Sequence, residues 1–173
     1  MLHVAFFRNM NLGQARSASP TSAQLLAAFA AAGAQHAANF QVNGTVVFEA
    51  GDPRAVVDGV RQVLAGATGY SDAAVVRGAD WLVDLAGRLD ADLPGAEVAL
   101  FDASSVPALG LPWVDAGGNL TVVELDRLHA VTSWAAGNTG SGANPVLTRL
   151  LGVPVTCRGV RTMIRLAARL SAS

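Results

Sequence analysis

Two predicted β-hairpins, one in each half of the chain, limit the fold of this 173-residue protein most strongly. In the first, the strand-like segments 39–42 and 45–48 flank Asn43 and Gly44, a pair that favours a two-residue type I′ turn. A second pair of strand-like segments surrounds Asp126. Because hairpins interrupt the alternation of strand and helix, the sequence predicts an α+β fold and not a parallel Rossmann sheet.

Helical patterns separate the predicted strands, and several begin with residues typical of helix N-termini. The clearest start is Asp52 followed by Pro53, a capping residue and then a proline. Three other helices are expected over 23–32, 144–151 and 160–170, and Asp80 is expected to cap a fourth. Further strands are expected over 3–8, 73–77, 97–102 and 153–157. This order repeats approximately, which predicts two related halves, 1–87 and 96–173, joined by a connector over 88–95.

Composition excludes several classes of protein. The chain is 51% hydrophobic and 14% charged, so it can bury a core and is not generally disordered. The net charge of −1 gives no general attraction to nucleic acid or to anionic membranes. No segment approaches the roughly 20 apolar residues that a membrane span needs. Cys157 is the single cysteine, so the chain has no internal disulfide, which agrees with a reducing compartment. We therefore expect a cytoplasmic protein. The absence of lysine excludes Schiff-base chemistry and a Walker-type phosphate site.

Three separated segments carry a family resemblance. Residues 8–13 are similar to Arg-Gly-Ile-Asn-Val-Gly, and residues 40–48 are similar to Ile-Gln-Ser-Gly-Asn-Val-Val-Phe. Residues 144–162 look like a helix, a Leu-Gly-Val-Pro turn and a Thr-Thr-Arg-Asn-Trp-Asn-Thr ending. In this order and spacing they resemble the bacterial family called domain of unknown function 1697. The chain departs from the family pattern, with Asn9 in place of glycine and Gly142 in place of lysine.

The resemblance implies two ferredoxin-like halves with antiparallel or mixed sheets and helices packed on them. It implies no activity, but it marks a set of polar residues at strand ends and turns, where binding groups often lie. These candidate ligand-binding residues are Arg8, Asn11, Gln41, Asn43, Arg158 and Thr162. Arginine and amide side chains donate in planar geometries that suit carboxylate, phosphate or a base edge. The alternative is that the arginines form structural ion pairs and the asparagines serve turns.

A glycine-rich loop supplies a weaker candidate. Residues 137–142 precede a predicted helix and could form an anion site from backbone amides, with Gly140, Ser141, Gly142 and Asn144 as the candidate residues. The spacing matches no known phosphate-binding motif, and a flexible loop before a capped helix explains it equally well.

Two functions remain open. The first is a binding protein that takes a small anion or an acidic partner in a cleft between the halves. The second is a small enzyme acting on a phosphorylated or nucleotide substrate, with Glu124 or Asp126 as general base. The histidines show no zinc-ligand spacing, so we expect no metal and no cofactor. The absence of a nucleophile, base or metal group among the resembling residues favours binding, and the oligomeric state stays open.

Overall fold

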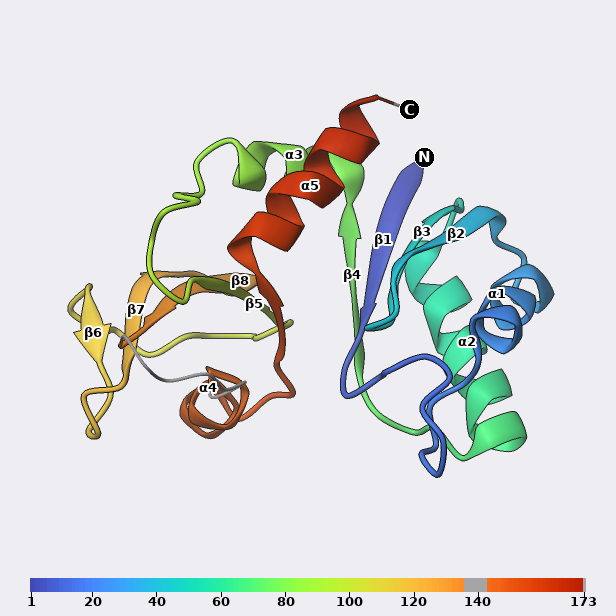
Figure 1. Ribbon diagram of the computed structural model, residues 1–173, viewed down its shortest axis with the longest axis horizontal. Helices are drawn as coiled ribbons and strands as arrows, with labels where there is room; N and C mark the ends of the chain where they lie inside the picture. The colour runs from blue at the N-terminus through green and yellow to red at the C-terminus, as the bar shows by residue number, and fades with distance from the viewer. Residues whose placement is uncertain (136–142, 173) are drawn as a thin grey trace. The chain divides into compact units, whose positions relative to one another are not determined.

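The computed structural model describes residues 1–135 and 143–172 and divides into two compact units (Figure 1). Unit 1 is Met1–Trp81 and unit 2 is Leu82–Ser173. The part of the chain that the structure describes contains five helices and two antiparallel sheets, of four and five strands. The predicted α+β class is therefore confirmed.

Unit 1 alternates strands, helices and a hairpin. Its elements are β1 (Leu2–Phe7), α1 (Ser22–Ala31), β2 (Gln35–Gln41), β3 (Thr45–Glu49), α2 (Pro53–Thr68) and β4 (Ala74–Gly78). The strands form sheet A in the order β2-β3-β1-β4, and every neighbouring pair is antiparallel. Helix α3 (Ala79–Ala86) begins in unit 1 and ends in unit 2. Asp80 lies in its first turn and does not precede it, which corrects the predicted cap.

Local sequence accounts for both long helices of unit 1. Thr21 accepts a hydrogen bond from the backbone of Gln24, whose side chain accepts one in return, and this capping box starts α1. Asp52 caps α2 by accepting a hydrogen bond from the backbone N–H of Ala55, at 3.0 Å. Both helices contribute to a single buried core with one face of sheet A, in which Phe29 packs against Phe7 and Phe48. The core thus holds the strand ends at fixed positions.

The turn of the first hairpin differs from the prediction. Strand β2 ends at Gln41 and β3 begins at Thr45, so the connection has three residues, and of these only Gly44 has a positive φ, of 71°. A type I′ turn would need two such residues. A Cβ atom on Gly44 would lie 2.9 Å from the Phe7 Cβ atom and would also press on Met10. Packing against the end of β1 therefore fixes the position of this glycine.

Unit 2 is a second sheet with helices. Its elements are β5 (Glu97–Leu100), β6 (Trp113–Val114), β7 (Leu120–Leu125), β8 (His129–Trp134), α4 (Ala143–Leu151), β9 (Thr156–Gly159) and α5 (Val160–Ser171). The strand order of this sheet B is β6-β7-β8-β5-β9. Sequence reasoning missed β6 and placed β9 three residues too early, at 153. Leu120, Leu147 and Val155 lie in the core of this unit.

The two units share a strand connectivity. Without β6, sheet B has the order β7-β8-β5-β9, which repeats the order β2-β3-β1-β4 of sheet A. Val4 pairs with Arg77 across β1 and β4, and Val98 pairs with Arg158 across β5 and β9. Both arginines are buried, and each donates from Nη1 to the carbonyl of the preceding residue, at 2.7 and 2.8 Å. Arg77 and Arg158 therefore occupy equivalent positions.

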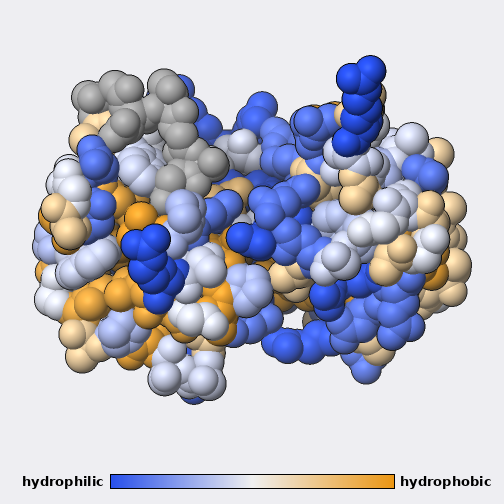
Figure 2. Space-filling model, turned by 90° about the horizontal axis from the view of Figure 1, so that it is seen from below, coloured by the Kyte–Doolittle hydropathy of each residue, from blue (hydrophilic) through white to orange (hydrophobic). Residues whose placement is uncertain are grey.

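Both units expose some large hydrophobic residues. In unit 1 these are Met1, Val42 and Val63, and in unit 2 they include Leu111, Val114 and Val123. The left-hand part of Figure 2 shows apolar patches on the visible face of this unit. Over the residues that the structure describes, no helix has the length and apolar character needed to cross a membrane.

Candidate functional site

Three segments of unit 1 meet where β1 ends. They are the loop that leaves β1, the hairpin between β2 and β3, and the segment that enters β4. The backbone hydrogen bonds that join them are Phe7 N to Gly44 O (2.9 Å), Arg8 N to Ala73 O (2.9 Å) and Leu12 N to Val42 O (2.7 Å). We call this region the polar end of sheet A, and it contains Arg8, Asn9, Asn11, Gln41, Asn43, Thr45, Arg61, Tyr70 and Asp72.

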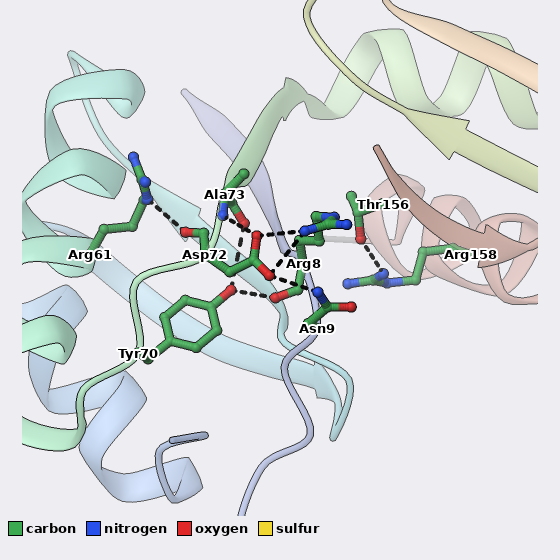
Figure 3. A network of polar contacts seen from close by, with 8 residues as sticks. All are labelled: Arg8, Asn9, Arg61, Tyr70, Asp72, Ala73, Thr156 and Arg158. Atoms are coloured by element: carbon green, nitrogen blue, oxygen red, sulfur yellow. Dashed lines mark hydrogen bonds and ion pairs between the residues drawn. The ribbon is translucent and has the colours of Figure 1, made fainter. Parts of the chain in front are cut away.

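An ion pair between Arg8 and Asp72 lies at the centre of this region (Figure 3). The Nη1 atom of Arg8 lies 3.0 Å from one carboxylate oxygen of Asp72 and 3.2 Å from the other. The two side chains are 27% and 25% exposed, so the pair is only partly screened by water. The guanidinium of Arg8 is therefore held in one orientation.

The carboxylate of Asp72 accepts further hydrogen bonds. Asn9, whose backbone has a positive φ of 50°, donates from its amide at 2.7 Å, and the backbone N–H of Ala73 donates at 2.7 Å. Partial burial alone would raise the pKa of Asp72, but the hydrogen bonds from Ala73, Arg8 and Asn9 outweigh it and lower that pKa. Asp72 is thus an ionised, fully engaged acceptor.

Tyr70 and Arg61 support the same network through the backbone. The hydroxyl of Tyr70, a residue that is 4% exposed, donates to the carbonyl of Arg8 at 2.5 Å. The Nε atom of Arg61 donates to the carbonyl of Asp72 at 3.0 Å. Helix α2 and the segment before β4 therefore fix both members of the ion pair.

The hairpin contributes neutral side chains to this end. The amide of Asn43 donates to the side-chain oxygen of Gln41 at 3.1 Å, and the buried hydroxyl of Thr45 donates to the side-chain oxygen of Asn43 at 2.8 Å. Asn11 is exposed on the loop after β1, and its backbone N–H donates to the hydroxyl of Ser19 at 3.0 Å. Four predicted site residues, Arg8, Asn11, Gln41 and Asn43, thus lie at the same end of one sheet.

The other predicted residues belong to unit 2. Arg158 is 6% exposed and donates from Nη1 to the hydroxyl of Thr156 at 2.9 Å and to the carbonyl of Cys157. Thr162 lies in the first turn of α5, and its hydroxyl accepts from Arg165 at 3.4 Å. Each of these groups has a structural contact within its own unit.

Most of the weaker anion site predicted from the sequence is not described by the structure. Gly140, Ser141 and Gly142 lie outside the described residues. Asn144 lies in the first turn of α4, and its buried Oδ1 atom has no hydrogen-bond partner.

A second polar cluster lies in the β7–β8 hairpin of unit 2. The ring of His129, which is fully buried, lies with Nδ1 3.0 Å from a carboxylate oxygen of Asp126 and Nε2 2.9 Å from one of Glu124. Each ring nitrogen of His129 therefore lies within hydrogen-bond distance of a carboxylate. Arg88 also forms an ion pair with Glu124. We call these four residues the His129 clamp.

The contacts of the His129 clamp lower the pKa values of Glu124 and Asp126. Burial opposes the ionisation of Glu124 and Asp126, but hydrogen bonds outweigh it, from Arg88 to Glu124 and from the backbone N–H groups of Leu128 and His129 to Asp126. The nearby charge of His129 adds to this effect, and the pKa of each acid is lowered. A lowered pKa makes a carboxylate a weaker general base at neutral pH.

Sequence reasoning missed several residues of both clusters. Asp72, Tyr70 and Arg61 are far from Arg8 in the chain, and no local pattern marks them. The His129 clamp did have a signal, because acids three and five residues before a histidine flank a predicted hairpin turn. The sequence analysis considered the histidines only as zinc ligands and therefore did not predict this structural cluster. Within the described residues, no three His, Cys, Asp or Glu side chains are grouped to hold a metal.

Comparisons with known proteins agree with this fold. The model of the family described as "Protein of unknown function (DUF1697)" matches residues 1–93. A solved structure of a conserved bacterial protein, SP0830 from Streptococcus pneumoniae, has a TM-score of 0.64 with 12% sequence identity over 98% of each chain. No curated protein matches the sequence significantly. At this identity the structural likeness concerns the fold alone.

Proposed function

Because the chain belongs to the DUF1697 family of proteins of unknown function, whose description assigns no activity, we propose a function from its own residues. We infer that it is a binding protein that takes a small anionic ligand at the polar end of sheet A. This region lies wholly within unit 1 and needs no residue of unit 2.

One observation supports the proposal most, namely the number of donor groups at this end of the sheet. Arg8 pairs with the carboxylate of Asp72, while Arg61 donates to the backbone carbonyl of Asp72 and lies 3.5 Å from a carboxylate oxygen of the exposed Asp58. Amide side chains of the hairpin and of the loop after β1 add neutral donors. Such a donor-rich surface favours phosphate or carboxylate.

The rigidity of Arg8 also favours binding. Its side chain is held by Asp72 and its carbonyl by Tyr70, so a ligand would meet a guanidinium that is already oriented. Fixing a side chain before binding lowers the entropy lost on association. The same ion pair makes Asp72 a competitor for the ligand, and this competition can be measured.

An enzyme is the less favoured function. Glu124 and Asp126, its candidate bases, are hydrogen-bonded within the His129 clamp and have lowered pKa values.

The binding function also suits a cytoplasmic location, which the single free cysteine supports. A carboxylate of an acidic partner protein would meet the same donors as a small anion.

The test compares three variants in calorimetric titrations with inorganic phosphate, citrate and adenosine monophosphate. Arg8→Ala should weaken binding at least about tenfold, because a hydrogen bond to a charged group contributes roughly 1.5–3 kcal/mol. Asp72→Asn keeps a similar shape but removes the competing charge, so it should strengthen binding. Arg165→Ala removes an exposed arginine of α5 and should change nothing.

The opposite outcomes would reject the proposal. If Asp72→Asn binds no more tightly than the wild type, the ion pair does not compete with a ligand. If none of the three anions binds to the wild type or to Asp72→Asn, Arg8 has a structural role only. Circular dichroism of each variant separates lost binding from lost folding.

A further inference from the structure

The opposite end of sheet A contains a cavity of about 430 Å³. It lies where β1 begins, where β3 ends and where the chain passes from α1 to β2. Its lining residues are Met1, His3, Gly33, Gln35, Glu49, Ala50 and Gly51, all in unit 1. A cavity of this size falls within the range of small-molecule sites in proteins. It shares no residue with the polar end of sheet A, so a ligand in this cavity would be independent of the proposed function.

Two exposed glycines lie among the residues that line this cavity. A Cβ atom built on Gly33 or on Gly51 would meet no atom within 4 Å. Gly33 has a φ of 86°, which disfavours other residues, whereas Gly51 does not have a positive φ. A larger side chain can therefore be introduced at Gly51, beside the cavity, without backbone strain.

His3 supplies a hydrogen-bond acceptor to the cavity wall. The residue is 8% exposed, and its ring packs against Phe48 with centroids 5.9 Å apart. Burial, assisted by the positive amino group of Met1, lowers the pKa of His3, while a hydrogen bond to the carbonyl of Ala50 opposes that shift. The ring is therefore neutral at pH 7. With one nitrogen donating to Ala50, the other nitrogen carries a lone pair.

Glu49 and Gln35 supply further polar groups of the lining, in addition to the amino group of Met1. Gln35 and Glu49 pair across β2 and β3 at the open end of the hairpin, away from its turn. The register of this pair shifts between Gln35 and Ala38, and His36 has a φ of 50° in that interval. Such β-bulges occur often beside binding sites, because they redirect side chains. Glu49 brings the only carboxylate among the lining residues.

We propose that this cavity binds a small molecule through a primary amine. The carboxylate of Glu49 offers a charge-assisted hydrogen bond to an ammonium group, and the neutral ring of His3 accepts a second one. The apolar surface of Met1 and Ala50 suits a short carbon chain. His3 and Glu49 are too few for a metal ion, which requires at least three protein ligands in such sites.

The test uses matched pairs of ligands that differ only in charge. Putrescine and ethanolamine are titrated into the full chain at pH 7.5, with 1,4-butanediol and ethylene glycol as their neutral counterparts, and dissociation constants are measured by NMR. The amines should bind at least about tenfold more tightly than the diols. Glu49→Gln should remove this preference, and Gly51→Leu should weaken all binding by about tenfold or more.

Gly110→Leu is the matched control, because a Cβ atom at Gly110 also meets nothing within 4 Å and that glycine lies in unit 2. It should bind the amines as the wild type does. The proposal is overturned if a folded wild type binds no amine at about 10 mM. It is also overturned if folded Gly51→Leu binds as well as the control.

A pH series gives a second readout. As pH falls through the lowered pKa of His3, protonation removes the acceptor and adds a positive charge to the wall. Amine affinity should therefore decrease between pH 7.5 and pH values below about 6, the usual range of histidine being near 6.5. An affinity that stays constant over this range would exclude His3 from the site.

Discussion

The turn of the β2–β3 hairpin in sheet A and the turn of the β7–β8 hairpin in sheet B occupy equivalent positions, but the side chains around them differ in chemistry. Phe6 pairs with Thr45 in unit 1, and Leu100 pairs with His129 in unit 2, so these two buried polar residues correspond. Thr45 donates to a neutral asparagine, whereas His129 lies between two carboxylates. The same connectivity therefore supports a neutral amide network in one unit and an ionic cluster in the other.

The difference shows where charge remains for a ligand. In unit 2 the side chains of Glu124, Asp126, His129 and Arg88 contact one another. In unit 1 the turn of the hairpin, residues 41–45, carries no ionisable side chain, and the charged residues lie beside it, at Arg8 and Asp72. We therefore expect unit 2 to use this end for stability and unit 1 to use it for binding.

The largest expected effect comes from the two corresponding buried residues. His129→Ala should lower the free energy of unfolding by about 3 kcal/mol, because it leaves a cavity and removes the partner of two carboxylates. Thr45→Val should lower it by only about 1 kcal/mol, since it removes one hydrogen bond at nearly constant volume. Urea unfolding measures both. An equal or larger cost for Thr45→Val would contradict the assigned difference.

Acid should affect the two ends differently. The pKa values of Glu124 and Asp126 are lowered in the folded chain, so their contribution to stability is present above their unfolded values, near pH 4. It is lost as pH falls through the lowered folded values. A Glu124→Gln/Asp126→Asn double variant should therefore show a smaller loss of stability between pH 5 and pH 3, measured by thermal unfolding. Gln41 and Asn43 do not titrate, so Gln41→Ala should leave this slope unchanged.

The smallest effect concerns Cys157. By strand register it corresponds to Val76, since Ala5 pairs with Val76 and Ala99 with Cys157. Burial raises the pKa of the Cys157 thiol far above its usual range, so little thiolate is available. Cys157→Val should change stability by less than about 1 kcal/mol. Labelling of the wild type by a thiol reagent should need unfolding, and rapid labelling of the native chain would contradict this.

Local sequence patterns predicted helices and hairpins correctly where contacts between residues close in sequence determine the structure. Asp52 and Pro53 start a helix, and the segments around Asn43 and Asp126 form hairpins, as predicted. The turn type was wrong because the contact of Gly44 with the end of β1 joins residues far apart in sequence. Strand β6, only two residues long, carries too little pattern to be predicted.

The candidate site was predictable only in part. Arg8, Asn11, Gln41 and Asn43 were named from their resemblance to family motifs, and all four lie at one end of sheet A. The partner of Arg8 could not be named, because Asp72 is 64 residues away and only the pairing of β1 with β4 brings it close. No single segment of the sequence shows the packing that brings such groups together.

The most direct test of binding by unit 1 is an NMR titration of the ¹⁵N-labelled full chain with inorganic phosphate. We predict that shift changes concentrate at the backbone amides of Arg8, Asn9, Asn43 and Asp72, and that the amides of Asp126 and His129 do not move. Changes confined to Asp126 and His129, or no specific changes at all, would contradict the assignment of binding to unit 1 and of structural support to the corresponding end of unit 2.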